Sequence, residues 1–274
     1  MKEQIISKLK GLTKHNHIEI VLKGDRAIWS ALHLVKKKLL IPEEGGWMSY
    51  EKYPAKMGID SEKVACNDAV IDLDDLKQKV KTADVFLYQN PGGYHAEQPM
   101  KEIYQICQEN DCLVVLDVSG AMGTELCDGD YADVMLSSFG RWKLIDAKAG
   151  GFISCKDETV FNEIKDTFEI LDDDEKLANI NEKIDDLPNR IKFLTETRNK
   201  VLNDLKELEE LKGSNVINKD HLGFVVIVSF EEDSEKDKIT TYCNQNNLEY
   251  TECPRYIRIN KKAISIEIKR ISTK

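Results

Sequence analysis

The stretch LVVLDVSGAMG, residues 113–123, decides the fold of this 274-residue chain. Its first four residues, Leu113 to Leu116, form a short apolar run of the kind found in strands that are buried on both faces. Asp117 then places a carboxylate directly after the strand. Ligands of α/β sheets bind at the carboxyl ends of the strands. Asp117 is therefore the first candidate for a functional residue.

Similar short apolar runs flank this stretch and alternate with helical patterns. The pattern predicts helices over residues 1–10, 25–38, 73–81 and 99–110, and strands over 17–22, 39–42, 85–88, 113–116 and 134–137. Strands separated by helices are typical of a mostly parallel sheet covered on both faces. We therefore expect an α/β fold.

Composition divides the chain into three parts. Residues 1–155 carry the α/β pattern, and residues 156–212 are rich in Lys, Glu and Asp and are expected to form a helical connector that ends at Gly213. Residues 213–274 are expected to form a small β-α-β-β domain, with strands over 223–229, 256–259 and 263–268 and a helix over 234–246. The predicted architecture is a large α/β domain plus a small C-terminal α+β domain.

The overall charge argues against several classes of partner. A net charge of −10 and an isoelectric point near 5.2 disfavour nonspecific binding to nucleic acid or to anionic membranes. The N-terminal segment lacks the apolar core of a signal peptide, which favours a cytoplasmic protein. Seven cysteines, an odd number in a long chain, favour reduced thiols. Their spacing matches no common metal-ligand pattern, so no metal is expected.

Lys143 follows Asp117 by 26 positions, after another predicted strand and a turn. Pyridoxal 5′-phosphate (PLP) chemistry needs both kinds of group: a lysine for a Schiff base, and a carboxylate that keeps the pyridine nitrogen protonated. Each residue also has an ordinary interpretation, since an Asp after a strand commonly caps the backbone and a Lys after a turn is commonly exposed. Lys148 is a rival for the lysine role, although its spacing from Ser138 fits less well.

Two segments together resemble a known family. DVSGAMG, residues 117–123, resembles the D-x-x-[QH]-A-x-G stretch of the DegT/DnrJ/EryC1/StrS aminotransferases, and SFGRWK, residues 138–143, with Gly150-Gly151 beyond it, resembles their S-F-x-x-x-K…G-G segment. The resemblance implies a fold-type I PLP-dependent transferase with PLP bound to residues 1–155. It also implies a homodimer.

The resemblance assigns roles to particular residues. Lys143 would bind PLP covalently, Asp117 would pair with the pyridine nitrogen, and Ser138 would help to hold the phosphate. The turn from Gly24 through Asp25 and Arg26 into a helix looks like the family's phosphate-binding turn, in which backbone N–H groups and the helix dipole bind the anion. Here Arg26 would contact the phosphate directly, whereas Asp25 would repel it.

The chain departs from the family at Gly120, which stands where Gln or His is common. Trp47 or Tyr94 is a candidate to supply an aromatic face to the cofactor instead. Asn90, in a turn after the strand at 85–88, is a candidate to line the cleft.

In the small domain, Arg258 is a candidate to bind a substrate carboxylate, with Arg270 as a second candidate. Both arginines also have an ordinary interpretation, as side chains in contact with solvent.

Three functions remain open from the sequence. The first is an aminotransferase that moves an amino group from an amino acid to an unidentified keto or aldehyde acceptor. The second is a PLP-dependent lyase or desulfurase, for which Cys127 is the candidate persulfide carrier, although acidic neighbours disfavour it. The third is a non-catalytic protein of the same fold, which the departures at Gly120 and at the turn from Gly24 to Arg26 motivate.

Overall fold

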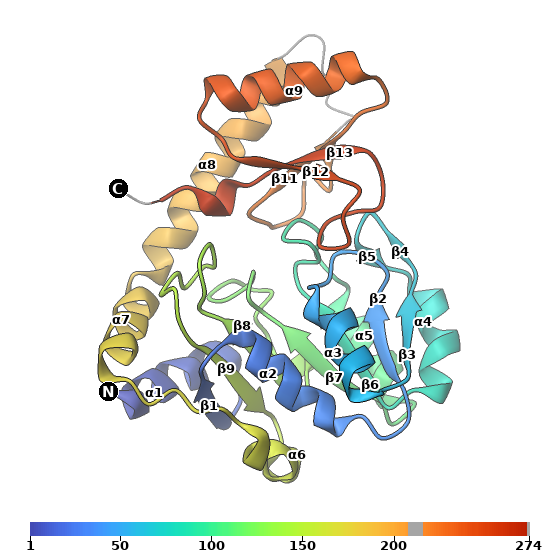
Figure 1. Cartoon of the computed structure of the whole chain (residues 1–274), viewed down its shortest axis with the longest axis vertical. Helices are drawn as coiled ribbons and strands as arrows, with labels where there is room; N and C mark the ends of the chain where they lie inside the picture. Colours follow the sequence, from blue (N-terminus) through green and yellow to red (C-terminus); the bar gives the residue numbers. More distant parts are fainter. Residues whose placement is uncertain (208–215, 273–274) are drawn as a thin grey trace.

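The computed structural model describes residues 1–207 and 216–272. The N-terminal part is built on a seven-stranded sheet and the C-terminal part on a separate four-stranded sheet. Figure 1 shows the small sheet above the large one, with the long helix α8 (Leu187–Glu207) rising along one side between them. The expected large α/β domain with a small C-terminal domain is confirmed. The expected boundary at Gly213 lies outside the described residues.

The large sheet is mostly parallel. Its strand order is β1-β9-β8-β7-β6-β2-β3, and the pairs from β3 through β2, β6 and β7 to β8 are parallel. β9 runs antiparallel to both β8 and β1. The strands are β1 (His17–Val21), β2 (Leu39–Pro42), β3 (Ser61–Val64), β6 (Val85–Gln89), β7 (Leu113–Asp117), β8 (Val134–Ser138) and β9 (Gly151–Cys155). A short hairpin, β4 (Cys66–Asn67) with β5 (Val70–Ile71), lies beside the sheet.

Helices cover both faces because successive strand residues point to opposite sides. Val114 and Leu116 belong to one apolar cluster and Val115 to the other. The first cluster includes side chains of α1 (Lys2–Thr13), α4 (Leu73–Lys79), α5 (Met100–Gln108), α7 (Asp174–Asp185) and α8. The second includes side chains of α2 (Gly24–Ala31), α3 (Ser49–Met57) and α6 (Glu158–Ile164).

The large domain differs from expectation in two helices, one shorter than expected and one not expected. The helix expected over 25–38 ends as α2 at Ala31 and continues only as a 3-10 turn, Leu32–Leu34. The cause is Asp84, whose carboxylate accepts hydrogen bonds from the backbone N–H groups of residues 36, 37 and 38. Those N–H groups are no longer available to a helix. Helix α3 was not expected, because its apolar spacing is irregular and it contains Pro54.

The small domain contains the expected strand, helix and two further strands, with one of these strands misplaced and an additional short strand, β10, before them. Its sheet is β10-β11-β13-β12, and α9 (Asp233–Gln245) lies across it; the strands are β10 (Val216–Ile217), β11 (Val226–Ser229), β12 (Tyr250–Cys253) and β13 (Ala263–Ile266). The strand expected over 256–259 is a turn, in which Arg258 N–H donates to the Arg255 carbonyl. Pro254 ends β12 because it has no N–H to extend the ladder.

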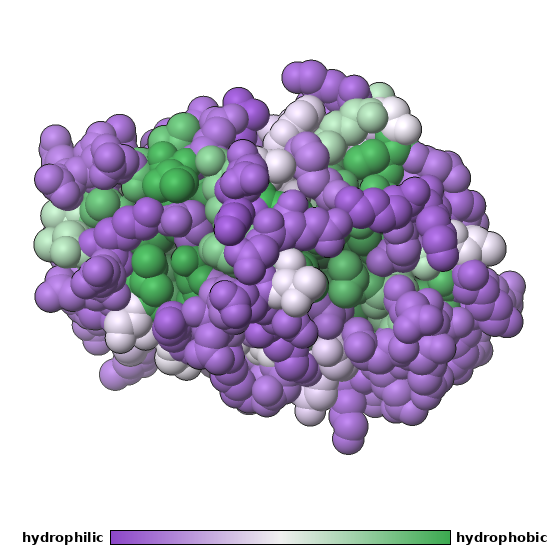
Figure 2. All heavy atoms as spheres, turned by 90° about the horizontal axis from the view of Figure 1, so that it is seen from below, coloured by the Kyte–Doolittle hydropathy of each residue, from purple (hydrophilic) through white to green (hydrophobic). Residues whose placement is uncertain are grey.

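The face of the molecule seen from below is predominantly hydrophilic (Figure 2). Figure 2 shows one end of the molecule, where hydrophobic residues lie in separate areas between hydrophilic ones. No helix within residues 1–207 and 216–272 has both the length and the apolar character needed to cross a membrane.

Candidate functional site

A cavity of about 470 Å³ lies at the carboxyl end of the large sheet, where residues that follow β1, β7 and β8 converge. Six of the residues expected from the sequence line it: Gly24, Asp25, Trp47, Asp117, Ser138 and Lys143. They come from positions up to 119 residues apart, which only the strand order brings together. Three other expected residues, Arg26, Asn90 and Arg258, are not among its lining residues.

Asp117 ends β7 and is 4% exposed. One of its carboxylate oxygens accepts a hydrogen bond from the Tyr50 hydroxyl at 2.8 Å, and the other accepts one from the backbone N–H of Ser119 at 2.8 Å. Burial, together with the neighbouring Asp117 charge, raises the pKa of Tyr50 well above its usual value. Tyr50 therefore stays protonated and keeps donating, which fixes the orientation of the Asp117 carboxylate.

Another part of the cavity wall is formed by a close approach of chain segments around Gly24. A Cβ atom at Gly24 would lie 2.5 Å from the Cβ of Ser138, and a Cβ at Gly151 would lie 2.9 Å from the N of Gly24. Only glycines fit there. Gly24 is the first residue of α2, so the free N–H groups of that helix start at the cavity. The Ser138 hydroxyl lies in the same corner and accepts from the backbone N–H of Gly140 at 3.1 Å.

Lys143 extends from the turn after β8, where its backbone N–H donates to the Gly140 carbonyl. Its Nζ donates a hydrogen bond to the Tyr94 hydroxyl and lies 5.0 Å from the centroid of the Trp47 ring. The Trp47 ring thus forms a wall beside this amine. Lys148 also lines the cavity.

The carboxylate of Asp25 is already engaged within the chain. One of its oxygens accepts hydrogen bonds from Trp47 Nε1 at 2.9 Å and from the Ser49 hydroxyl at 2.8 Å. These bonds tie the start of α2 to the start of α3 and hold the Trp47 indole in place. They also partly offset the repulsion that Asp25 exerts on an anion at the helix terminus.

Arg26 and Asn90 are directed to other partners. Arg26 forms an ion pair with Glu169 at 3.1 Å, and its side chain is 42% exposed. Asn90 is fully buried, and its side-chain oxygen accepts from the backbone N–H of Gln98 at 3.1 Å. Its side-chain nitrogen has no partner among the described residues. Neither residue faces the cavity in this arrangement.

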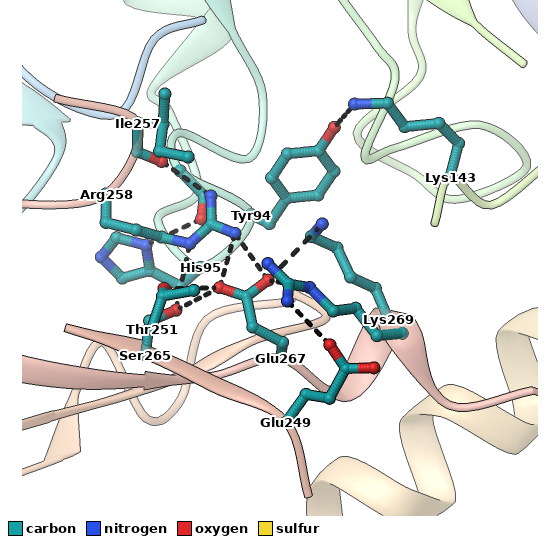
Figure 3. Close-up of polar contacts among 12 residues, drawn as sticks. Tyr94, His95, Lys143, Glu249, Thr251, Ile257, Arg258, Ser265, Glu267 and Lys269 are labelled. Atoms are coloured by element: carbon teal, nitrogen blue, oxygen red, sulfur yellow. Dashed lines mark hydrogen bonds and ion pairs between the residues drawn. The ribbon is translucent and has the colours of Figure 1, made fainter. Parts of the chain in front are cut away.

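Arg258 is 2% exposed and lies in a buried ionic cluster at the base of the small domain (Figure 3). It donates to both carboxylate oxygens of Glu267 at 2.9 and 2.8 Å, to the Ser265 hydroxyl and to the Ile257 carbonyl. Nε and both guanidinium NH2 groups of Arg258 thus already have partners within the chain, so it offers no open fork for a substrate carboxylate. The other candidate, Arg270, pairs with Glu249 at 2.8 Å.

Burial raises the pKa of Glu267, but the positive charges of Arg258, Lys269 and Arg270 outweigh burial and bring that pKa to about 2. Lys269 completes the cluster, with its Nζ 3.5 Å from Glu267 and 4.7 Å from the centroid of the Tyr94 ring. Burial lowers the pKa of Lys269 to about 7, against the opposing effect of Glu267. Tyr94 therefore lies between the cluster and Lys143, because it contacts both Lys269 and Lys143.

Sequence reasoning missed Tyr50, Ser119 and Lys269. Ser119 stands inside the DVSG segment, and its hydroxyl accepts from the backbone N–H of Ser138 at 2.9 Å, which joins the ends of β7 and β8. Its place two residues after Asp117 was a usable signal. Tyr50 and Lys269 carried no such signal, because they lie far from the motifs in sequence and meet the site only in the folded chain.

Cys127 does not line the cavity and is buried, with its thiol 3.5 Å from the Leu12 carbonyl. Burial raises its pKa to about 12. A buried, protonated thiol is a poor nucleophile, so Cys127 lacks the properties of a persulfide carrier.

Comparison with protein families gives two matches along the chain. Residues 61–171 match the DegT/DnrJ/EryC1/StrS aminotransferase family, the same family that the motifs at Asp117 and Lys143 indicated. This match shows that residues 61–171 of the chain are similar to that family. Residues 193–274 match a different description, the MJ1341 family C-terminal domain. The segment matched by the aminotransferase family holds Asp117, Ser138 and Lys143, and the segment matched by the second description holds Arg258 and Lys269.

Solved structures with this fold include proteins bound to PMP, a putative sugar aminotransferase and a cysteine desulfurase. NtdA from Bacillus subtilis, with bound cofactor PMP, is 16% identical with a TM-score of 0.77, over 97% of this chain and 72% of that chain. The putative sugar aminotransferase Spr1654 from Streptococcus pneumoniae, in its PMP form, is 12% identical with a TM-score of 0.74, over 99% and 88%. A cysteine desulfurase from Thermococcus onnurineus is 11% identical with a TM-score of 0.67, over 97% and 78%. These similarities show that the chain has the fold of these proteins. No curated protein matches it by sequence.

Proposed function

We propose that this chain is a PLP-dependent aminotransferase that moves an amino group from an amino-acid donor to a keto or aldehyde acceptor. The observation that carries the proposal is the shared cavity, in which the Lys143 amine, the Asp117 carboxylate and the N-terminus of α2 are assembled from separate strands. The fold is also that of chains solved with PLP or PMP, such as Spr1654.

One feature of the cavity supports PLP as its ligand. The contact between Gly24 and Ser138 leaves no space for a side chain, and it exposes backbone N–H groups and a hydroxyl to one end of the cavity. That end suits a phosphate. Asp117 suits a pyridinium nitrogen, Trp47 suits the face of the ring, and Lys143 suits the covalent link. When bound, PLP supplies a ring that accepts electrons and so stabilises negative charge beside the substrate amino group.

The protein groups then have defined tasks. Asp117, held by Tyr50 and Ser119, would keep a proton on the ring nitrogen. The Nζ of Lys143 would hold the cofactor and would serve as the general base and acid for the proton of the substrate carbon. The buried walls formed by Leu136 and Ile28 limit the access of water.

A desulfurase function is not favoured by this site, because Cys127 is buried outside the cavity.

We further propose a homodimer. The apolar side chains of Leu22, Met48 and Ile170 are 40%, 43% and 47% exposed. Leu22 lines the cavity, and Met48 adjoins the lining residue Trp47. A partner chain covering them would close the site. Light scattering of the purified protein tests this assignment, and a monomer at micromolar concentration contradicts it.

The decisive experiment is a PLP titration followed by absorbance, with Lys143→Ala as the test variant. Lys148→Ala is the matched control, since both lysines line the same cavity. We expect wild type and Lys148→Ala to develop the visible band of lysine-bound PLP and Lys143→Ala to lose it. Borohydride reduction and peptide mapping should then locate the cofactor on Lys143.

The other outcomes are equally informative. Loss of the band in Lys148→Ala alone would transfer the covalent role to Lys148. A wild-type protein with no band would refute the enzyme assignment and leave a non-catalytic protein of this fold. Where the band forms, conversion of PLP to PMP by amino acids tests amino transfer, and sulfide release from cysteine tests the desulfurase alternative.

A further inference from the structure

Tyr94 lies between the two domains and contacts cationic side chains from both. It is 4% exposed. Its ring centroid lies 5.0 Å from Lys143 Nζ, 4.7 Å from Lys269 Nζ and 5.5 Å from Arg258 Cζ. Figure 3 shows the ring between Lys143 and the ionic cluster around Glu267, with its hydroxyl at the Lys143 amine. Because the face of an aromatic ring attracts cations, these three contacts help to hold the Tyr94 ring in its position.

Gly120 makes room for this ring. A Cβ atom at position 120 would lie 2.8 Å from Tyr94 Cδ1 and 3.0 Å from Tyr94 Cε1. Both distances are too short for carbon atoms that are not bonded to each other. Glycine at position 120, where Gln or His is common in the family, therefore leaves space next to the end of β7, and the Tyr94 ring fills that space.

The backbone of Tyr94 is fastened to the small domain. Its carbonyl accepts hydrogen bonds from the backbone N–H groups of Phe224 at 2.9 Å and Val225 at 3.3 Å. The Phe224 carbonyl in turn accepts from the backbone N–H of Lys269 at 2.9 Å. The residue that holds the Lys143 amine is thus itself held by the small domain.

We propose that Tyr94 is a positioning residue for Lys143: its hydroxyl accepts from the Nζ of that lysine, and its backbone places the hydroxyl according to the position of the small domain. This inference takes one point from the proposed function, namely the catalytic role of Lys143. It assigns to the C-terminal domain a task in the site that Arg258 and Arg270 do not perform. Through Tyr94, the small domain sets where the reacting amine lies.

The test measures the reactivity of the Lys143 amine in protein without cofactor. Limiting acetic anhydride at pH 8, followed by peptide mapping, gives the labelling rate of Lys143 relative to exposed lysines. Tyr94→Phe keeps the ring and its contacts with cations and removes only the hydroxyl. Tyr88→Phe is the matched control, because the Tyr88 hydroxyl is buried on β6 and has no partner among the described residues.

We expect about tenfold faster labelling of Lys143 in Tyr94→Phe and no change in Tyr88→Phe. The reason is that the hydroxyl holds the amine beside the buried ring, and without this hydrogen bond the amine is free to meet the reagent. If Tyr94→Phe fails to fold by circular dichroism, Gly120→Ala, which displaces the same ring, takes its place in the measurement.

Equal labelling rates in wild type and the folded Tyr94 or Gly120 variant would overturn the inference. Because the assay contains no PLP, its result does not depend on the proposed function. A wild type that never attaches PLP would refute the function alone, whereas equal labelling alongside a normal PLP band would refute the role of Tyr94 alone.

Discussion

Replacing Lys269 with methionine should change how the stability of the protein depends on pH. Lys269 is 7% exposed, and burial lowers its pKa from the usual 10.5 to about 7. In the unfolded chain the same amine keeps its proton up to the usual value. Between pH 7 and 10.5 the unfolded state therefore binds one more proton than the folded state. The free energy of unfolding of wild type must then rise with pH in this window, relative to a variant without the amine.

The expected magnitude follows from one proton. A difference of one bound proton changes the free energy of unfolding by about 1.4 kcal/mol per pH unit. From pH 7.5 to 9.5, wild type should gain about 2–3 kcal/mol relative to Lys269→Met. Other titrating groups are common to both proteins and cancel in the difference.

The assay is urea unfolding of both proteins without cofactor at pH 7.5, 8.5 and 9.5, followed by circular dichroism. Lys262→Met is the control, because that side chain is exposed and keeps its hydration in both states. Its stability should run parallel to that of wild type at all three pH values. A constant difference between wild type and Lys269→Met would refute the reasoning, since it would mean that Glu267 outweighs burial and keeps Lys269 charged in the folded protein.

Two further substitutions test the ionic cluster and the close-packed corner of the cavity. Glu267→Gln leaves buried cations without their carboxylate and should cost about 3–5 kcal/mol in urea unfolding at pH 7, whereas Glu249→Gln, whose side chain is 59% exposed, should cost at most about 1 kcal/mol. Equal losses would show that burial of the cluster does not matter. Gly24→Ala places a Cβ 2.5 Å from Ser138 Cβ and should cost about 1–3 kcal/mol and weaken PLP binding, while Gly11→Ala, with open space at its Cβ position, should stabilise helix α1 by about 0.5–1 kcal/mol. Thermal melts and PLP titrations of both variants check this, and an unchanged Gly24→Ala protein would contradict the packing argument.

The central part of the fold was predictable because its signals are local. The strands ending at Asp117 and Ser138 are short apolar runs, and their order along the chain is that of alternating strands and helices. The positions of Asp117, Ser138 and Lys143 at one cavity followed from the rule for the carboxyl ends of parallel strands. The misplaced strand at 256–259 shows the limit of this reasoning, since alternation of side chains in a turn resembles a strand.

The sequence by itself determined the α/β class, the family resemblance and the residues of the cavity that lie within or next to motifs. The tertiary structure alone decided how those residues are held. Tyr50 reaches Asp117 across 67 positions, and Tyr94 contacts Lys143 from the large domain and Lys269 from the small one. Arg258, an attractive carboxylate ligand in the sequence, is paired with Glu267 in the fold. The physical reason is that local patterns depend on backbone geometry, whereas partnership between distant side chains depends on which chain segments packing brings within hydrogen-bond distance.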